Sequence, residues 1–359
     1  MSAFAGFGIW AQRNRWIWSA IGVLILWLVL SVVTNRFSLS SLSGVILSAS
    51  FLTVVGIGQM FVVTTGRGNI DLSVASVITL SAFVALLTIK GQDANLAIGV
   101  LAAILLGLAV GALNSLLVVG LGIPAIIATL ATGYVLATAT LLSNKAIPGF
   151  AVSPALKELA TGRISGVPIM AIIAILGVAA TAFVLRYTVF GQLLSAVGQN
   201  RAAARLAGIR NGRVIASAFI ISSVLASLDG LLLGAYIGGA FLEMGQPYLL
   251  QSIAAVVLGG TLIFGGSATA LGTLFASILL VLIVTTMQII GLPPGAQDIV
   301  QGVVVIFVLA LAGRQAQARR AFVEIADGDD DATADAEASA ATATRSEGAT
   351  NQRFLLPIW

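Results

Sequence analysis

The chain has 359 residues, of which 58% are hydrophobic and 9% are charged, and its formal net charge is +4. An average soluble domain has roughly 25% charged residues, so this composition excludes a water-soluble fold of this size. The absence of cysteine and histidine excludes disulfides, thiol nucleophiles, Cys/His zinc sites and any mechanism that needs an imidazole base. These proportions indicate an all-α, polytopic integral membrane protein.

Apolar stretches of membrane-spanning length follow one another along the chain. A bilayer core about 30 Å thick requires about 20 apolar residues per helix. We expect about ten transmembrane helices, at residues 16–34, 42–64, 70–89, 96–119, 123–143, 168–187, 214–237, 247–265, 268–290 and 297–313. Because the chain contains 39 glycines, some of these helices should be broken or re-entrant, as in residues 256–267.

The distribution of basic residues predicts the orientation. The first span is typical of an uncleaved signal anchor, because its apolar stretch is longer than that of a secretory signal. With ten spans and a cytoplasmic N-terminus, eleven basic residues face the cytoplasm: Arg13, Arg15, Arg67, Arg186, Arg201, Arg205, Arg210, Arg213, Arg314, Arg319 and Arg320. Five face the opposite side: Arg36, Lys90, Lys145, Lys157 and Arg163. This bias favours an orientation with both termini in the cytoplasm.

Three regions are expected. Residues 1–15 form a cytoplasmic N-terminal segment and residues 16–313 form the transmembrane domain. Residues 314–359 carry eight acidic residues among alanine and threonine, and they predict a disordered cytoplasmic tail because they cannot bury enough apolar surface.

The glycine-containing segment 64–73 joins the second and third spans. Its glycines allow a tight turn, after which Asn69 or Asp71 can accept hydrogen bonds from the free N–H groups of the next helix. Arg67 either pairs with Asp71 or is an ordinary topogenic charge.

Asp229 is an acidic residue well inside an expected span, where a charged side chain is costly. The pair Asp229-Gly230 could mark a helix break at which the carboxylate caps backbone N–H groups. Alternatively, Asp229 hydrogen-bonds substrate along a polar path or carries protons.

The polar stretch 191–209 lies between the sixth and seventh spans. Asn200 is a good N-cap and Gly208 a good stop signal, which predicts a short helix over residues 201–207. One face carries Ala203, Leu206 and Ala207. Because so short a helix is unstable alone, either the membrane surface or a cytoplasmic partner must hold it.

No Gly-Lys-Ser or Gly-Lys-Thr sequence occurs, so the chain lacks a phosphate-binding P-loop. Any ATP that drives transport must therefore be bound by another subunit. We expect no catalytic residue, metal site or cofactor in this chain.

Four motifs resemble the permease subunits of ABC importers for ribose and related simple sugars, within the branched-chain amino acid and simple sugar permease superfamily. They are Ile70-Asp71-Leu72-Ser73-Val74, Ile123-Pro124 followed by Ile127-Ala128-Thr129-Leu130, the stretch from Ala196 to Ile209, and Ile253 to Thr261 with Gly265-Gly266. They span about residues 44–313 in the order usual for the family. Arg201 departs from the pattern, since this position is commonly acidic, and Asp229 stands where the family usually has a small apolar residue.

The resemblance implies a permease subunit in the bacterial inner membrane that imports a pentose, hexose or related polyol and has no catalytic activity. It implies a second permease subunit, identical or different, two ATP-binding subunits or one fused ATPase, a soluble sugar-binding protein and membrane lipid as partners, and no nucleic acid. Segment 191–209 then couples to the ATPase through Gly198, Asn200, Ala203, Leu206, Ala207 and Gly208. The candidates for the substrate path are Asp71, Asn114 and Asp229. The alternative is a secondary transporter of a small polar solute, which would need internal ion-binding carboxylates that the sequence mostly lacks.

Overall fold

The computed structural model describes residue 14 and residues 16–33, 39–144, 149–293, 295–297, 299–304, 306–307 and 310. These residues are mainly helical, and their two short strands, β1 (Arg163–Ile164) and β2 (Val167–Pro168), pair antiparallel. The prediction of an all-α membrane protein is confirmed. The expected N-terminal segment, apart from residue 14, and the acidic tail 314–359 lie outside the described residues.

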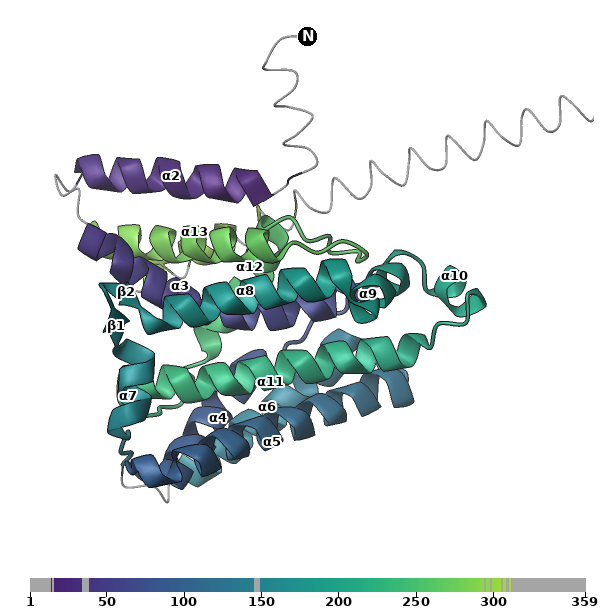
Figure 1. Cartoon of the computed structure of the whole chain (residues 1–359), viewed down its shortest axis with the longest axis horizontal. Helices are drawn as coiled ribbons and strands as arrows, with labels where there is room; N and C mark the ends of the chain where they lie inside the picture. The colour runs from purple at the N-terminus through teal and green to yellow at the C-terminus, as the bar shows by residue number, and fades with distance from the viewer. Residues whose placement is uncertain are drawn as a thin grey trace, which may run out of the picture. The chain divides into compact units, whose positions relative to one another are not determined.

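Most expected spans are single helices (Figure 1). Within the described residues, six helices are long and apolar enough to cross a membrane. They are α3 (Leu39–Thr64), α5 (Leu96–Ser115), α6 (Ala125–Asn144), α8 (Ile169–Tyr187), α11 (Asn211–Ile237) and α13 (Ala270–Ile289). The first expected span is α2 (Trp16–Val33). Residues 297–313 are described only in part, and their described residues are helical, so the count of ten stays a prediction.

Two expected spans, 70–89 and 247–265, contain shorter helices than their hydropathy predicts. Helix α4 (Val74–Ile89) has 16 residues and α12 (Gln246–Leu258) has 13. At 1.5 Å per residue they measure about 24 Å and about 20 Å, which is less than the bilayer core. Non-helical backbone replaces the remaining turns at residues 70–73 and 259–269. The predicted boundaries of these two spans were wrong, because hydropathy does not show where side chains replace the hydrogen bonds of a helix. The expectation of a broken helix near 256–267 is confirmed.

Helix α11 packs along α5, α4 and α3, and Figure 1 shows it beside α5. On α5, Gly107 and Gly111 face α11 so closely that an added Cβ would lie 2.6 Å from the Cα atoms of Val224 and Ile220. Small residues four apart allow such an approach of two helix backbones in a membrane.

The alternative that Asp229-Gly230 marks a helix break is wrong, because α11 continues through both residues. Gly230 instead lets α11 approach α4, since an added Cβ would lie 2.9 Å from the carbonyl carbon of Ile78. The glycine therefore serves helix packing and does not end the helix.

Short elements occupy the two ends of the helix bundle (Figure 1). One end has η1 (Asp93–Asn95), α7 (Pro154–Thr161) and the β1–β2 hairpin, and the other has the π-helical turn η2 (Leu116–Gly120), α9 (Val189–Gln199) and α10 (Arg201–Leu206). Helix α9 was not expected from the sequence. Thr188 caps it by accepting from Gly191 N, and Leu194 and Val197 are fully buried, so the segment is an amphipathic helix and not a polar loop.

Candidate functional site

The extended segment before α4 is held by the side chain of Asp71. Its Oδ1 accepts hydrogen bonds from Ser73 N at 3.0 Å and Ser73 Oγ at 2.6 Å, and its Oδ2 accepts from Ser222 Oγ of α11 at 2.9 Å. The prediction that Asp71 accepts from an N–H group at the start of the next helix is confirmed. Arg67 is exposed at the turn. Among the described residues, the Asp71 carboxylate is hydrogen-bonded by Ser73 and Ser222 and not by Arg67, so the alternative that Arg67 pairs with Asp71 is wrong.

Asn114 belongs to the same buried polar cluster. Its Nδ2 donates to Ser73 Oγ at 2.9 Å, which joins α5 to Asp71 through one serine. In its preferred amide orientation Gln59 donates to Asp71 O at 3.2 Å and accepts from Asp71 N at 3.3 Å. The structure therefore brings together two of the three substrate-path candidates, in a cluster that fixes non-helical backbone at membrane depth.

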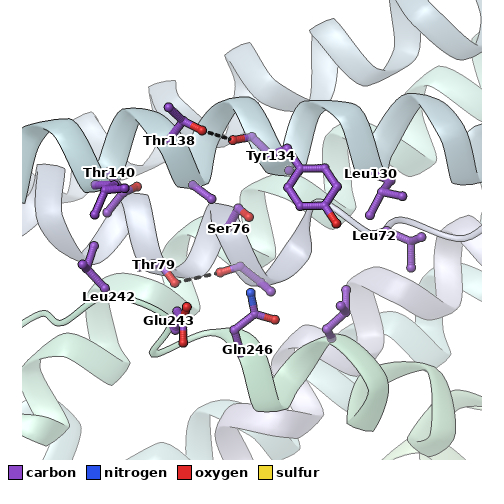
Figure 2. A pocket seen from close by; sticks show the side chains of 15 residues that line it. Leu72, Ser76, Thr79, Leu130, Tyr134, Thr138, Thr140, Leu242, Glu243 and Gln246 are labelled. Carbon is purple, nitrogen blue, oxygen red and sulfur yellow. Dashed lines mark hydrogen bonds between the residues drawn. The ribbon is translucent and has the colours of Figure 1, made fainter.

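A pocket of about 360 Å³, whose lining is mainly apolar with a few polar groups, adjoins this cluster through Leu72 (Figure 2). Leu72, the residue after Asp71, lines it, and Leu72 N donates to Thr129 Oγ1 of α6 at 2.9 Å. The other lining residues come from α4, α6, α12 and the segment that leads into α12. They are Ala75, Ser76, Thr79, Leu130, Gly133, Tyr134, Ala137, Thr138, Thr140, Leu141, Leu242, Glu243, Gln246 and Leu249.

The first turns of both short helices line the pocket, since Ala75 and Ser76 lie in the first turn of α4 and Gln246 is the first residue of α12. The first N–H groups of a helix lack intrahelical partners and form the positive end of its dipole. Gly245 joins the two helix starts, because its N–H donates to Thr79 Oγ1 at 3.1 Å. A Cβ at Gly245 would overlap the carbonyl oxygen of Ala75, so glycine is required for this approach.

Glu243 supplies a carboxylate to the pocket from a strained position. Its φ of 67° lies in the left-handed region, which a glutamate rarely adopts, and its side chain is exposed. Such strain persists where surrounding structure imposes it, and it is concentrated at ligand sites. In this pocket Glu243 offers a carboxylate, Gln246 an amide and Tyr134 an aromatic ring to a ligand (Figure 2).

Asp229, the third substrate-path candidate, does not line the pocket. It is fully buried, and neither of its carboxyl oxygens has a hydrogen-bond partner among the described residues. The structure therefore does not join it to Asp71 and Asn114.

The predicted helix at 201–207 is confirmed as α10, which ends at Leu206. Asn200 Oδ1 accepts from Ala202 N at 2.9 Å and Ala203 N at 3.1 Å, and Gly208 ends the turn with a φ of 81°. Ala203, Leu206 and Ala207 are exposed as expected, and Leu206 is 88% exposed.

Gly198 lies apart from this exposed face. A Cβ there would overlap Thr64 O and Gly266 N, so Gly198 packs against the ends of α3 and of the loop that follows α12. Arg201 is half-buried and donates from Nη2 to Thr65 O at 3.1 Å and Gly66 O at 3.2 Å. Burial, with the Arg67 charge adding to it, lowers the pKa of Arg201 below its ordinary value.

The sequence alone did not identify the pocket residues on α6 and before α12. Tyr134 and Thr138 are spaced four apart and therefore share one face of α6, a polar stripe in an apolar span that could have indicated a lined cavity. Glu243 and Gln246 gave no comparable signal, because both read as ordinary polar residues between two spans.

Comparisons with known proteins agree with this architecture. Residues 41–309 match the family described as branched-chain amino acid transport system / permease component. The chain is 33% identical over 306 residues to the autoinducer 2 import system permease protein LsrC of Yersinia pseudotuberculosis serotype O:1b, covering 84% of this chain and 86% of that protein. It is 34% identical over 309 residues to the protein of that name from Enterobacter sp. (strain 638), covering 85% and 89%. No solved structure matches the chain. The chain therefore belongs to the family of branched-chain amino acid transport system permease components.

Proposed function

We propose that this chain is the transmembrane permease subunit of an ABC importer and that it moves a simple sugar or related polyol through the pocket between α4, α6 and α12. Members of this family are transporter subunits and not enzymes. The relatives are named for import of autoinducer 2, a sugar-like solute, which makes that compound one candidate among small polyhydroxylated substrates.

The observation that carries the proposal is the pocket at the starts of two short helices, where a mainly apolar lining carries a few polar groups. Broken helices whose N-termini meet at a cavity are a recurring form of substrate site in transporters. Hydroxyl, amide and carboxylate groups beside the ring of Tyr134 match a solute with several hydroxyl groups and one apolar face. The volume of about 360 Å³ suits a molecule of monosaccharide size.

The positions of the basic residues support a cytoplasmic location for the end of the bundle that carries α9 and α10. Among the described residues, this end holds Arg67, Arg186, Arg201, Arg205, Arg210 and Arg213, whereas the opposite end holds Lys90, Lys157 and Arg163. An excess of basic residues is typical of cytoplasmic loops in a bacterial inner-membrane protein. Glu243 and Gln246, which follow α11, then face the outside and receive the solute.

Helix α10 is the proposed contact with an ATP-binding subunit. Its exposed Leu206, beside the small residues Ala203 and Ala207, forms an apolar contact surface on the cytoplasmic end. An external binding protein delivers the solute, and a second permease subunit completes the membrane part.

The test is uptake by membrane vesicles that contain the chain, its ATPase and its binding protein, with radiolabelled ribose, glucose, ribitol and autoinducer 2 as probes. Glu243→Gln should lower the initial uptake rate about tenfold, because a hydrogen bond to a charged group contributes about 1.5–3 kcal/mol. The matched control is Glu158→Gln, an exposed glutamate on α7 outside the pocket, which should stay within about twofold of the parent. Equal rates for the two variants would contradict the assignment of the pocket.

A further inference from the structure

Three segments distant in sequence meet at the cytoplasmic end of α3. Gly266 N donates to Thr64 O at 3.0 Å, and Ser195 Oγ donates to Gly266 O at 2.6 Å. A Cβ at Gly66 would lie 2.7 Å from both Gly198 O and Phe264 O, so the three backbones are in direct contact. We call the contact between residues 64–66, 195–201 and 264–266 the three-segment junction.

Arg201, the first residue of α10, binds to the carbonyl groups of this junction. Its guanidinium donates to Thr65 O and Gly66 O, carbonyls at the C-terminal end of α3, where a positive charge is favourable. The backbone of the same residue is tied to α11, since Asn211 Nδ2 donates to Arg201 O at 2.7 Å. A displacement of α10 should therefore also move the turn that follows α3.

That turn leads within a few residues to the pocket. Gly66 O accepts from Asn69 N at 3.3 Å, and Asn69 Nδ2 donates to Thr65 Oγ1 at 2.8 Å. The extended residues that follow carry Asp71 and then Leu72, which lines the pocket. A continuous path of hydrogen bonds and backbone thus runs from Arg201 to the pocket wall.

We propose that Arg201 is a positioning residue that transmits the movement of α10 to segment 65–72 and so couples the state of the ATPase to the shape of the substrate pocket. This inference rests on the proposed function. Arg205 is a matched control, because it is an exposed arginine one turn further along the same short helix.

The absence of cysteine from the chain allows a direct test in the assembled importer. Ser76→Cys places a single thiol in the pocket wall, and its rate of reaction with a small maleimide is measured with and without ATP. ATP should change this rate about tenfold in the Ser76→Cys protein, a factor within the usual range of coupling free energies. Adding Arg201→Gln should reduce the change to less than about twofold, whereas adding Arg205→Gln should leave it unaltered.

Arg201→Lys should recover part of the response, because one ammonium group can still reach a carbonyl. Copurification of the ATPase and thermal unfolding identify variants that fail to assemble or fold. A full ATP response in the Arg201→Gln protein would overturn the inference while leaving the proposed function intact. No ATP response in the Ser76→Cys protein with both arginines present would instead contradict the proposed function, and the inference with it.

Discussion

Replacing Asp71 by alanine should destabilise the fold measurably, because three buried hydrogen bonds end on its carboxylate. The Ser222 bond reaches another helix, and such bonds contribute about 0.6 kcal/mol on average and about 1.7 kcal/mol at most. The two local bonds from Ser73 contribute about 0.5–1.5 kcal/mol each, so the total loss should be about 2–5 kcal/mol. Asp71→Asn keeps one carbonyl acceptor for Ser73 and should cost about 1 kcal/mol.

The assay is reversible unfolding in mixed detergent micelles, followed by circular dichroism. Asp93→Ala is the control, because Asp93 is exposed and its Oδ1 accepts one hydrogen bond, from Ala155 N at 2.9 Å. It should lose less than about 1 kcal/mol. If Asp71→Ala unfolds within about 0.5 kcal/mol of the parent, the carboxylate does not hold the extended segment and the description of the cluster is wrong.

Three other variants test separate parts of the structure. Gly198→Ala should reduce both thermal stability and uptake, because the added methyl overlaps Thr64 O and Gly266 N, whereas Gly149→Ala, which meets open space, should match the parent in both assays. Ala203→Trp should leave expression and melting unchanged while less ATPase copurifies, and undiminished copurification would remove α10 from the interface. Asp229→Asn should keep ATP-driven uptake, because the buried carboxyl group has no hydrogen-bond partner among the described residues to lose. Uptake that depends on a proton gradient and is abolished by Asp229→Asn would contradict this prediction.

Much of the helical layout could be predicted from the sequence, because hydropathy reports which residues lie in lipid. It could not locate the starts of α4 and α12, where apolar residues continue but the backbone leaves the helix. The backbone before α4 is held by the hydrogen bond between Ser222 of α11 and Asp71. These two residues lie far apart in sequence and meet only when α11 packs against α4. Local sequence carries no information about such a pairing.

Only part of the candidate site could be predicted, because contacts between residues that are distant in sequence depend on the fold. Asp71 and Asn114 were both named as substrate-path candidates, and the structure joins them through Ser73. Glu243 was missed because only the fold places it in the lining of the same pocket as Ser76 and Tyr134 (Figure 2). The contact between Arg201 and the end of α3 could not be predicted, since a basic residue in a polar stretch gives no sign that a helix end lies within reach.

The most direct test of the central claim is transport in proteoliposomes that contain the purified chain with its ATPase subunit. With the loaded binding protein outside and ATP available to the ATPase, the labelled sugar should accumulate, and omission of ATP, ATPase or binding protein should each abolish accumulation. The chain alone should neither hydrolyse ATP nor respond to a proton gradient. Accumulation by the chain alone under a proton gradient, without ATP, would contradict the claim and favour a secondary transporter.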